Sequence, residues 1–414
     1  MIDTIEVLDS LNINYSDNYY IKLIVSNNKF HPRLLSNEDN LLAIYLYNVE
    51  SKKSEVINIC HRDYLPLSKT YVNLFLSKFQ NLFTDDRKYI KYFLDLKVKS
   101  LKHFVGEIEV PYKNEYSEYK RCNQRRSLSK IKEHMDGIIR KIDFNIIYGK
   151  YYFFYDELED ILFDLESTPF KINKEILQSH YKHTLFNVDA DTLYQYHTLN
   201  KYRPSNSFNN INLYALNKNT DVRKMIVPNN DMLINLDYKA CHISLLFNTI
   251  GMSLDGDIYE LMSYELYGNR DRREDIKAMV FKIFFSEELY YSENNGYFAH
   301  ILNFKEKLLS EIKSNSVYLP IINENVESIT KVSDFFQLYE TINNVYKIRK
   351  ILSYIKGYKT KLILYTYDSF LFDFDKSELF LLKGIKNILE EMNLKVSMSV
   401  GYNYLELTPY IKQK

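Results

Sequence analysis

Two apolar runs in the C-terminal half of the chain meet an aspartate, and this pattern restricts the fold more than any other feature. "MLINLDY" places Asp237 at the end of one run, and "KLILYTYDSFLFDF" places Asp368 between a second run and its return. Apolar runs of this length are typical of buried strands, and the second predicts a β-hairpin with Asp368 in its turn. A single aspartate at a strand end is typically a turn former or a helix cap.

Two such aspartates have a different meaning if their strands pair. The carboxylates then converge at one edge of a sheet, where their repulsion is costly unless a cation lies between them. Mg²⁺ prefers oxygen ligands and leaves positions open for phosphate, and Mn²⁺ is expected to substitute for it. The pair therefore predicts a site for two divalent ions that serves phosphoryl transfer.

A predicted helix, "NRDRREDIKAMVFKIFFSE", lies between the two aspartates. Arg273, Lys277, Phe281 and Phe285 recur every four residues, so they share one broad stripe of the helix. The two cations suit a triphosphate, and the two rings suit a base and its sugar. Taken alone, the segment fits a surface helix whose cationic stems cover a hydrophobic patch at least as well.

Length and composition predict a soluble protein of two domains, divided near residue 150. The chain has 414 residues, with 46% hydrophobic and 26% charged. This size usually exceeds one core, and the composition is typical of folded proteins. No stretch approaches the roughly 20 apolar residues of a membrane span, and the start "MIDTIEVLDS" lacks signal-peptide character. We expect a cytoplasmic protein, in the host cytoplasm if it is viral.

The formal charge is zero, with 54 basic and 54 acidic residues. Any nucleic-acid binding must therefore come from local patches. The most basic region lies at 113–134, and four arginines fall in or near it: Arg121, Arg125, Arg126 and Arg140. A solvated helix face and a phosphate-contacting patch explain them equally well. The three cysteines are too few and too scattered for a disulfide framework or a four-ligand zinc site.

Several segments together resemble a known family. In order and spacing, "DYKACHISLL", "DIYELMSYELYGNRDRREDIKAMVFKIFFS", "FFQLYET" and "LYTYDSFLFD" resemble the polymerase core of family A DNA polymerases, the bacterial DNA polymerase I type. Upstream, "TLNKYRPSNSFNNINLYALNK" and "DVRKMIVP" look like the primer-grip and template-contact segments of that family. The resemblance covers roughly residues 155 to 410.

The resemblance implies an α/β (α+β) right-hand polymerase core with a palm sheet and helical fingers, behind an N-terminal mixed α/β domain. Residues 1–150 would form this accessory domain and 151–414 the core, with a reduced thumb at 151–200 and palm and fingers at 201–414. The implied reaction extends a primer 3′-hydroxyl on a DNA template with dNTPs. A short thumb grips duplex weakly, so a processivity factor, another replication protein or the N-terminal domain is expected to clamp the DNA. Such shortened enzymes resemble replicative polymerases of some bacteriophages.

The resemblance also implies a role for individual residues. The predicted metal ligands are Asp237 and Asp368. The predicted dNTP site consists of Arg273, Lys277, Phe281, His242 and Tyr238, with Lys277 also counted as catalytic. The predicted DNA contacts are Phe285 beside the templating base, Arg203 and Gln337 in the minor groove at the primer end, and Arg223 at the nucleotide or template. Minor-groove acceptors are nearly alike for every correct pair, so contacts there report geometry without reading sequence.

Three positions depart from the family pattern. His242 stands where the family usually has a glutamate under the sugar that excludes ribose. Ser369 replaces the carboxylate that usually follows Asp368, and the helix ends in Phe285-Ser286 where Tyr-Gly is usual. Two alternatives therefore stay open: a ribonucleotide-tolerant or RNA polymerase on the same fold, and a non-catalytic nucleic-acid-binding module.

The first 150 residues favour a degenerate or unrelated accessory domain over active proofreading. "LLAIYLYNVES" is similar to the first strand of the exonuclease domain of relatives, but Asn48 stands at its first aspartate. No convincing later set of carboxylates emerges from four other aspartates: Asp63, Asp85, Asp86 and Asp95. Near the second catalytic motif, Asp373 and Asp375 are expected to end the return strand and not to supplement the metal site.

Overall fold

The computed structural model divides into two compact units, residues 1–163 with 198–200, and residues 164–197 with 201–414. The structure describes residues 13–25, 41–59, 67–94, 96–101, 108, 124–144, 154–168, 171–180, 194–198, 202–208, 211–212, 219–252, 254, 256–285, 296–327 and 329–410. No helix within these ranges is long and apolar enough to cross a membrane. The expected boundary near residue 150 and much of the expected thumb lie outside them, so both assignments stay predictions.

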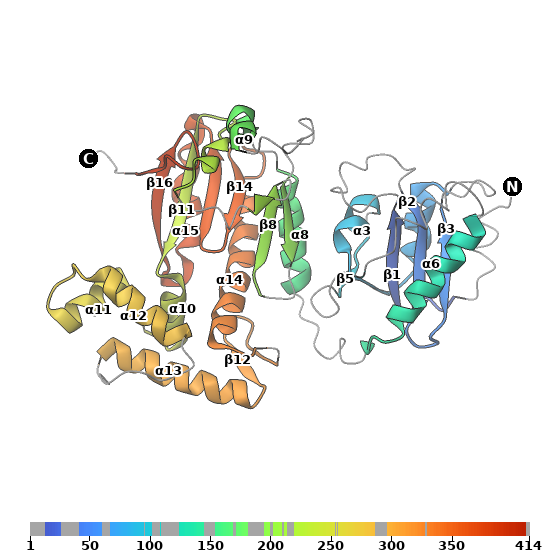
Figure 1. Cartoon of the computed structure of the whole chain (residues 1–414), viewed down its shortest axis with the longest axis horizontal. Helices are drawn as coiled ribbons and strands as arrows, with labels where there is room; N and C mark the ends of the chain where they lie inside the picture. Colours follow the sequence, from blue (N-terminus) through green and yellow to red (C-terminus); the bar gives the residue numbers. More distant parts are fainter. Residues whose placement is uncertain are drawn as a thin grey trace. The chain divides into compact units, whose positions relative to one another are not determined.

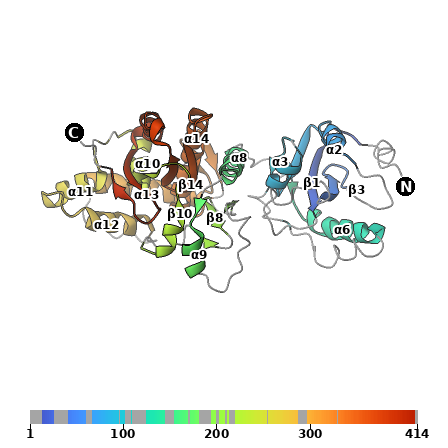
Figure 2. The same cartoon turned by 90° about the horizontal axis from the view of Figure 1, so that it is seen from above.

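The N-terminal unit is a mixed sheet with helices on both faces (Figures 1 and 2). Its strand order is β3-β2-β1-β4-β5, in which β1, β2 and β3 are antiparallel while β4 and β5 run parallel to β1. The strands are β1 (Asn18–Val25), β2 (Leu41–Asn48), β3 (Ser54–Asn58), β4 (Asn81–Thr84) and β5 (Lys99–Ser100). Its helices are α2 (Lys69–Leu76), α3 (Arg87–Phe93) and α6 (Gln124–Ile139), and helix α8 (Phe154–Glu166) spans the division at residue 163.

The side chains of β1 point alternately to the two faces of this sheet, and each face has its own hydrophobic core. Ile21 and Leu23 pack with Phe75 of α2 on one face, while Tyr20 packs with Met135 of α6 on the other. Successive side chains of a strand point to opposite faces, so a strand that is apolar throughout must be covered on both.

Asp85, which follows β4, is fully buried and held by protein donors. Its Oδ1 accepts from Tyr20 Oη at 2.6 Å, and its Oδ2 accepts from Lys22 Nζ at 2.6 Å and from the amide of Ile108 at 2.7 Å. A buried carboxylate requires such partners, and here a lysine supplies the positive charge. Of the other N-terminal aspartates considered for proofreading, Asp63 and Asp95 lie outside the described residues.

The second unit is built on an antiparallel sheet with strand order β14-β15-β11-β16-β17. Its strands are β11 (Met232–Lys239), β14 (Lys361–Thr366), β15 (Ser369–Phe374), β16 (Lys395–Gly401) and β17 (Thr408–Pro409). Three small sheets accompany it, formed by β6 (Lys171–Ile172) with β10 (Ile226–Val227), β12 (Val317–Leu319) with β13 (Glu324–Val326), and β7 (Tyr194–Thr198) with β8 (Pro204–Phe208) and β9 (Ile211–Asn212).

Helices cover this sheet and extend beyond one end of it (Figure 1). They are α9 (Lys174–His180), η5 (Asp221–Met225), α10 (Cys241–Thr249), α11 (Ile258–Tyr267), α12 (Arg273–Phe285), α13 (Gly296–Lys313), α14 (Val332–Tyr354), η6 (Lys376–Glu378), α15 (Leu381–Leu389) and η7 (Glu391–Asn393). The long α14 packs on the sheet, with Asn344 Nδ2 donating to Tyr365 Oη at 3.2 Å and Lys347 Nζ lying 5.1 Å from the Tyr238 ring centroid. The mixed α/β class expected from the sequence is confirmed.

Candidate active site

Asp237 and Asp368 lie at the same end of the central sheet because β11 pairs with β15. In this antiparallel register Asp237 faces Ser369, the residue after Asp368. The amide nitrogen of Tyr238 donates to the carbonyl oxygen of Asp368 at 2.8 Å. The predicted pairing of the strands and the predicted hairpin turn are confirmed, whereas metal binding by the two carboxylates stays a prediction.

Tyr367 and Asp368 form the turn between β14 and β15, and this turn is strained. Tyr367 has a φ of 57°, in the left-handed region. A bulky residue adopts that region at a cost of about 1–3 kcal/mol, and only where its surroundings enforce it. Asn344 Nδ2 donates to the carbonyl oxygen of Tyr367 at 2.6 Å, and the Arg203 guanidinium lies 4.4 Å from the Tyr367 ring centroid. These two contacts fix the residue that precedes Asp368.

A cleft of about 620 Å³ opens at this end of the sheet. Nine of the eleven predicted site residues line it: Arg203, Asp237, Tyr238, His242, Arg273, Lys277, Phe281, Phe285 and Asp368. Other lining residues include Asp257, Tyr259, Glu260, Phe284, Glu340, Tyr367 and Ser397. The cleft therefore gathers carboxylates from the sheet, cations from α12 and aromatic rings from several elements.

Gln337 and Arg223 are the two predicted residues that do not line this cleft. Gln337 lies on α14, one helical turn before the cleft residue Glu340. The Arg223 guanidinium lies 3.9 Å from the ring centroid of Tyr404. The DNA contacts proposed for these two residues are therefore not part of the cleft geometry, and they stay predictions.

Glu340 is a site residue that the sequence reading missed. Its side chain is 1% exposed, and its Oε2 accepts from Arg203 Nε at 2.7 Å. Arg203 Nη2 also lies 2.9 Å from His242 Nε2, which is 3.6 Å from Glu340 Oε1. The signal was a glutamate within "FFQLYETI", between residues whose apolar pattern predicts a buried face.

Burial and the charges of this cluster move the pKa values of two carboxyl groups in opposite directions. Burial alone raises the pKa of Glu340, but His242 and Arg203 outweigh burial and lower that pKa below its ordinary value. Burial raises the pKa of Asp368, and the negative charge of Glu340 raises it further. A carboxyl group whose pKa is raised by burial and a nearby anion binds cations readily, because a cation relieves the repulsion.

His242 is held against aromatic side chains as well as against the ion pair. Its ring stacks on Phe336 with centroids 5.5 Å apart and an interplanar angle of 21°, and Phe284 packs on Phe336 at 4.8 Å. Phe284 and Phe336 are both buried, so the ring that packs against the imidazole is itself held in place. His242 therefore presents a fixed ring to the cleft.

Arg273 begins α12, and acidic side chains bind it in this structure. Its Nε donates to Asp257 Oδ2 at 2.9 Å, and its Nη1 donates to Glu274 Oε1 at 2.6 Å. Asp257 also caps α11 by accepting from the amide of Tyr259 at 3.0 Å. Lys277, one turn further along α12, makes a weaker contact of 3.9 Å with Glu274. Both cations line the cleft and are positioned to exchange these carboxylates for phosphate oxygens.

Phe281 and Phe285 continue the stripe with exposed aromatic surface. They are 43% and 50% exposed, and their rings stack with centroids 5.4 Å apart. Large aromatic side chains bury more than 150 Å² each in a core, so two that are exposed side by side in a cleft suggest a partner with a flat face. At the C-terminal end of α12, buried Lys305 donates to the carbonyl oxygen of Ile283 at 2.7 Å and fixes that turn.

Asp373 lies at the other end of β15, away from the cleft. Its carboxylate accepts from the amides of Asn229 and Asn230, both at 3.0 Å. Asp375 follows the strand and caps η6 through Ser377. The expectation that these aspartates end the return strand agrees with their positions.

The donors in the cleft fit hard divalent cations. Among the described residues, no group of three or more histidine, cysteine, aspartate or glutamate side chains forms a closed metal cage. Mg²⁺ is typically held by one or two carboxylates together with waters and substrate phosphates, and Asp237 and Asp368 offer two carboxylates of this kind at one end of the sheet. Buried Cys241 is unsuited as a ligand at neutral pH, because burial raises its pKa well above the ordinary value.

Comparison with known proteins supports the fold at low sequence similarity. No protein-family model matches the chain, and no curated protein sequence matches it. Among solved structures, the chain is similar to the POL domain of Pol1 from M. smegmatis in complex with a DNA primer-template and dNTP, with a TM-score of 0.59 at 10% sequence identity. The match covers 94% of this chain and 96% of that chain. The chain therefore has the fold of a DNA polymerase domain of the bacterial Pol1 type.

Proposed function

We propose that this protein is a template-directed DNA polymerase that extends a primer 3′-hydroxyl with dNTPs. One arrangement carries the proposal: Asp237 and Asp368 lie at one sheet end, in the same cleft as Arg273 and Lys277 of α12. Carboxylates for metal ions facing cations for phosphates are what nucleotidyl transfer requires. A binding module has no need of the paired carboxylates, which favours catalysis over that alternative.

The roles of the side chains follow from their chemistry. Two Mg²⁺ ions held by Asp237 and Asp368 would activate the attacking hydroxyl and neutralise charge on the leaving pyrophosphate. Arg273 and Lys277 would hold the triphosphate, and Lys277 is also proposed to act in catalysis. Phe281 would stack on the incoming nucleotide. Catalysis would come mainly from positioning and electrostatic stabilisation, since phosphoryl transfer requires little covalent chemistry from the protein.

The primer-template would occupy the remaining walls of the cleft. Phe285 would lie beside the templating base, and Arg203 would contact the minor groove at the primer end with the orientation that Glu340 gives it. Gln337 and Arg223 are proposed as further DNA contacts outside the cleft. The same proposal includes a reduced thumb, dependence on a processivity factor and a role in phage-type replication.

His242 favours a second candidate, a polymerase that accepts ribonucleotides. Its ring lines the cleft directly after β11, beside Tyr238, where the sugar of a nucleotide would lie. Stacking on Phe336 and the contact with Arg203 keep the ring in place, so it is able to exclude a 2′-hydroxyl by bulk. Imidazole is nevertheless a hydrogen-bonding group that a ribose hydroxyl is able to satisfy. Sugar selection is therefore the property that separates the two candidates.

Primer extension by the purified full chain tests the proposal. With Mg²⁺ and a primed DNA template, each dNTP is expected to be added only opposite its complement, and dNTPs are expected to be preferred over rNTPs. Preference for rNTPs would replace the first candidate with the second. Absence of extension with either nucleotide, on a protein shown to bind the primer-template, would leave only the non-catalytic alternative.

A further inference from the structure

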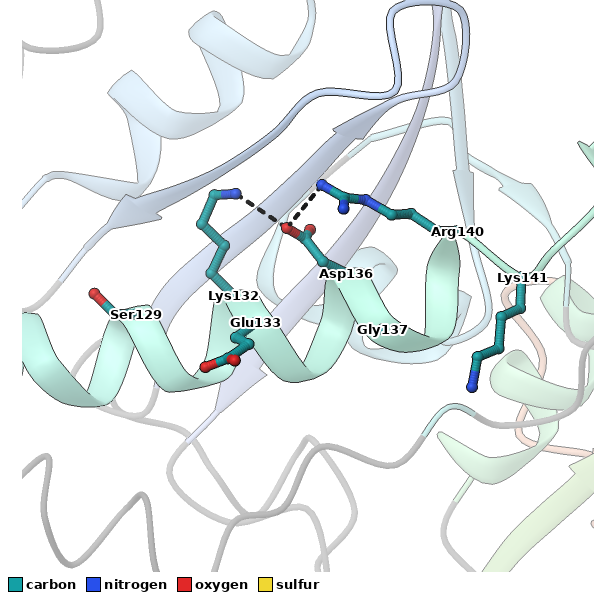
Figure 3. Close-up of a pocket in the computed structure, with 7 residues that line it drawn as sticks. All are labelled: Ser129, Lys132, Glu133, Asp136, Gly137, Arg140 and Lys141. Atoms are coloured by element: carbon teal, nitrogen blue, oxygen red, sulfur yellow. Dashed lines mark hydrogen bonds and ion pairs between the residues drawn. The ribbon is translucent and has the colours of Figure 1, made fainter.

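Helix α6 of the N-terminal unit carries a groove along its side, where Lys132 Nζ donates to Ser54 Oγ of β3 at 2.6 Å. Ile131, Met135 and Ile139 bury the neighbouring face of the helix against the sheet, each at most 3% exposed. The groove has a volume of about 490 Å³, and its described lining residues are Ser129, Lys132, Glu133, Asp136, Gly137, Arg140 and Lys141 (Figure 3). All of them are hydrophilic residues or glycine, and three of them, Lys132, Arg140 and Lys141, are basic.

Asp136 organises the cations of this groove. Its carboxylate accepts from Lys132 Nζ at 3.1 Å and from Arg140 Nη2 at 3.4 Å, and Tyr45 Oη donates to it at 2.6 Å. Burial raises the pKa of Asp136, but hydrogen bonds from Ser54, Tyr45 and Lys132 together lower it below its ordinary value, so the group is ionised at neutral pH. One shielded anion thus holds two cations eight residues apart, about 12 Å along the helix.

The cations belong to a basic segment in a chain that has no net charge. Residues 120–141 contain eight lysines and arginines but only two acidic residues, whereas the whole chain has 54 of each kind. Lys141 is exposed and points away from the Lys132 and Arg140 pair in Figure 3, so cations border the groove on both sides. A neutral protein that binds nucleic acid must do so through patches of this kind.

Gly137 provides an independent observation. A glycine within a helix destabilises it by about 1 kcal/mol relative to alanine, and it usually marks a close approach. Yet nothing in the described structure lies within 4 Å of the position that its Cβ would take. No packing inside the described residues requires this glycine, and its open position forms part of the groove. The space is suited to a backbone that crosses the helix here.

We propose that the α6 groove, lined by Ser129, Lys132, Glu133, Asp136, Gly137, Arg140 and Lys141, binds the phosphodiester backbone of nucleic acid through its three basic side chains. The strand crosses α6 at Gly137, and the cations on either side pair with successive phosphates. None of the described lining residues is aromatic, so we expect contacts to the backbone without base stacking, and binding that is independent of sequence. This site lies on the N-terminal unit and uses none of the residues proposed for catalysis.

The test measures oligonucleotide affinity of the full chain as a function of salt. Arg140→Gln with Lys141→Gln removes two cations while keeping good helix formers. Two lost phosphate contacts are expected to weaken binding of single-stranded DNA roughly tenfold near 50 mM salt and to reduce the slope of log K against log salt by roughly 1.4. The matched control, Lys69→Gln with Lys78→Gln, removes two exposed cations at α2 on the other face of the sheet and is expected to leave the slope unchanged.

A second variant blocks the groove without changing its charge. Gly137→Leu keeps every charge, favours the helix and fills the groove, so it is expected to weaken binding several-fold while poly-dA and poly-dT remain bound equally. Equal losses in the charge variant and its control, or full affinity in both groove variants, would overturn the proposal. Competition by polyglutamate as strong as that by oligonucleotide would instead assign the groove to acidic proteins. Extension by Arg140→Gln with Lys141→Gln at saturating primer-template should match wild type, so failure here is distinct from failure of the polymerase assignment.

Discussion

Arg203 donates through Nε to the carboxylate of Glu340 at 2.7 Å, linking the strand region before β8 to the middle of α14. Glu340 is almost fully buried, while Arg203 keeps part of its guanidinium in the cleft. The same guanidinium contacts His242 and the Tyr367 ring. This ion pair therefore holds together the wall that would face the primer end.

The loss of stability on breaking this ion pair is expected to depend strongly on which partner is replaced. Arg203→Ala leaves a buried carboxylate without its main cation and is expected to lower the free energy of unfolding by about 3 kcal/mol. Glu340→Gln keeps an acceptor for Arg203 and should cost about half as much. Urea unfolding of both variants checks the order. Equal losses, or a larger loss for Glu340→Gln, would contradict burial of an unpaired charge as the cause.

Asn344 is expected to act on catalysis through the strained turn, since it holds Tyr367 without lining the cleft. Asn344→Ala should lower kcat at least about tenfold and change KM for dNTP by less than about twofold, because small displacements of reacting groups are costly. Steady-state extension kinetics measure this split. Lys350→Ala, on the same helix and paired with Glu391, should keep its kcat. A rise in KM alone would refute the positioning role.

Lys347 is expected to make stability depend on pH. Its Nζ donates to the carbonyl oxygens of Leu389 and Glu391, and burial lowers its pKa from 10.5 to about 8. Between these two values the unfolded chain binds more protons than the folded one, so this group makes stability rise with pH across that window. The full gain is roughly 3 kcal/mol, at about 1.4 kcal/mol per pKa unit.

The comparison with Lys347→Met isolates this effect, because the other titrating groups are shared by the two proteins. Urea unfolding near pH 7.5 and near pH 10.5 gives the change in stability for each. The wild type is expected to gain more over this interval than Lys347→Met does. Identical pH profiles would show that the pKa of this amine is the same in the folded and the unfolded chain, which would contradict the effect of burial.

Lys22 and Asp85 are expected to be coupled in the N-terminal unit. Lys22→Met leaves Asp85 buried without its cation, which should destabilise the unit by about 3–5 kcal/mol. Lys22→Met combined with Asp85→Leu should recover much of that loss, since replacing both charges removes the need for a partner. A double-mutant cycle by urea unfolding measures the coupling, and additive losses would argue against it.

The same pair bears on proofreading. Because Lys22, Tyr20 and the amide of Ile108 take the acceptor positions of Asp85, we expect no metal-dependent removal of a 3′-mismatched primer end. Incubation of a labelled mismatched primer-template with Mg²⁺ and no dNTP tests this. Shortening of the primer that is lost on Asp85→Asn would mean that the carboxylate serves an exonuclease.

Local periodicity made much of this arrangement predictable from the sequence. The apolar runs around Asp237 and Asp368 and the four-residue spacing from Arg273 to Phe285 are properties of single segments, and the strands, hairpin and helix appear where those patterns indicate. Six of the nine predicted residues that line the cleft belong to these patterns, whereas Arg203, Tyr238 and His242 were expected only from the family resemblance. The role of each stays a proposal, because geometry alone does not establish chemistry.

Contacts between distant segments could not be predicted in this way. Glu340 and Arg203 are 137 positions apart, and no local pattern indicates that they pair. The left-handed turn at Tyr367 carries no glycine to signal it, since α14 and Arg203 impose the conformation from outside. The contact between Asp257 and Arg273 is likewise tertiary. The sequence therefore could not indicate that Arg273, which is predicted to bind the triphosphate, pairs with a carboxylate in this structure.

The most direct test concerns the two carboxylates that meet at the end of β11 and β15. Single-turnover incorporation of one dNTP should be measured with increasing Mg²⁺ for Asp237→Asn, Asp368→Asn and the control Asp231→Asn, an exposed aspartate that precedes β11. The first two should lose at least about 10³-fold in rate while binding primer-template like wild type, and the control should keep its rate. Near-normal incorporation by either Asp237→Asn or Asp368→Asn would contradict the account.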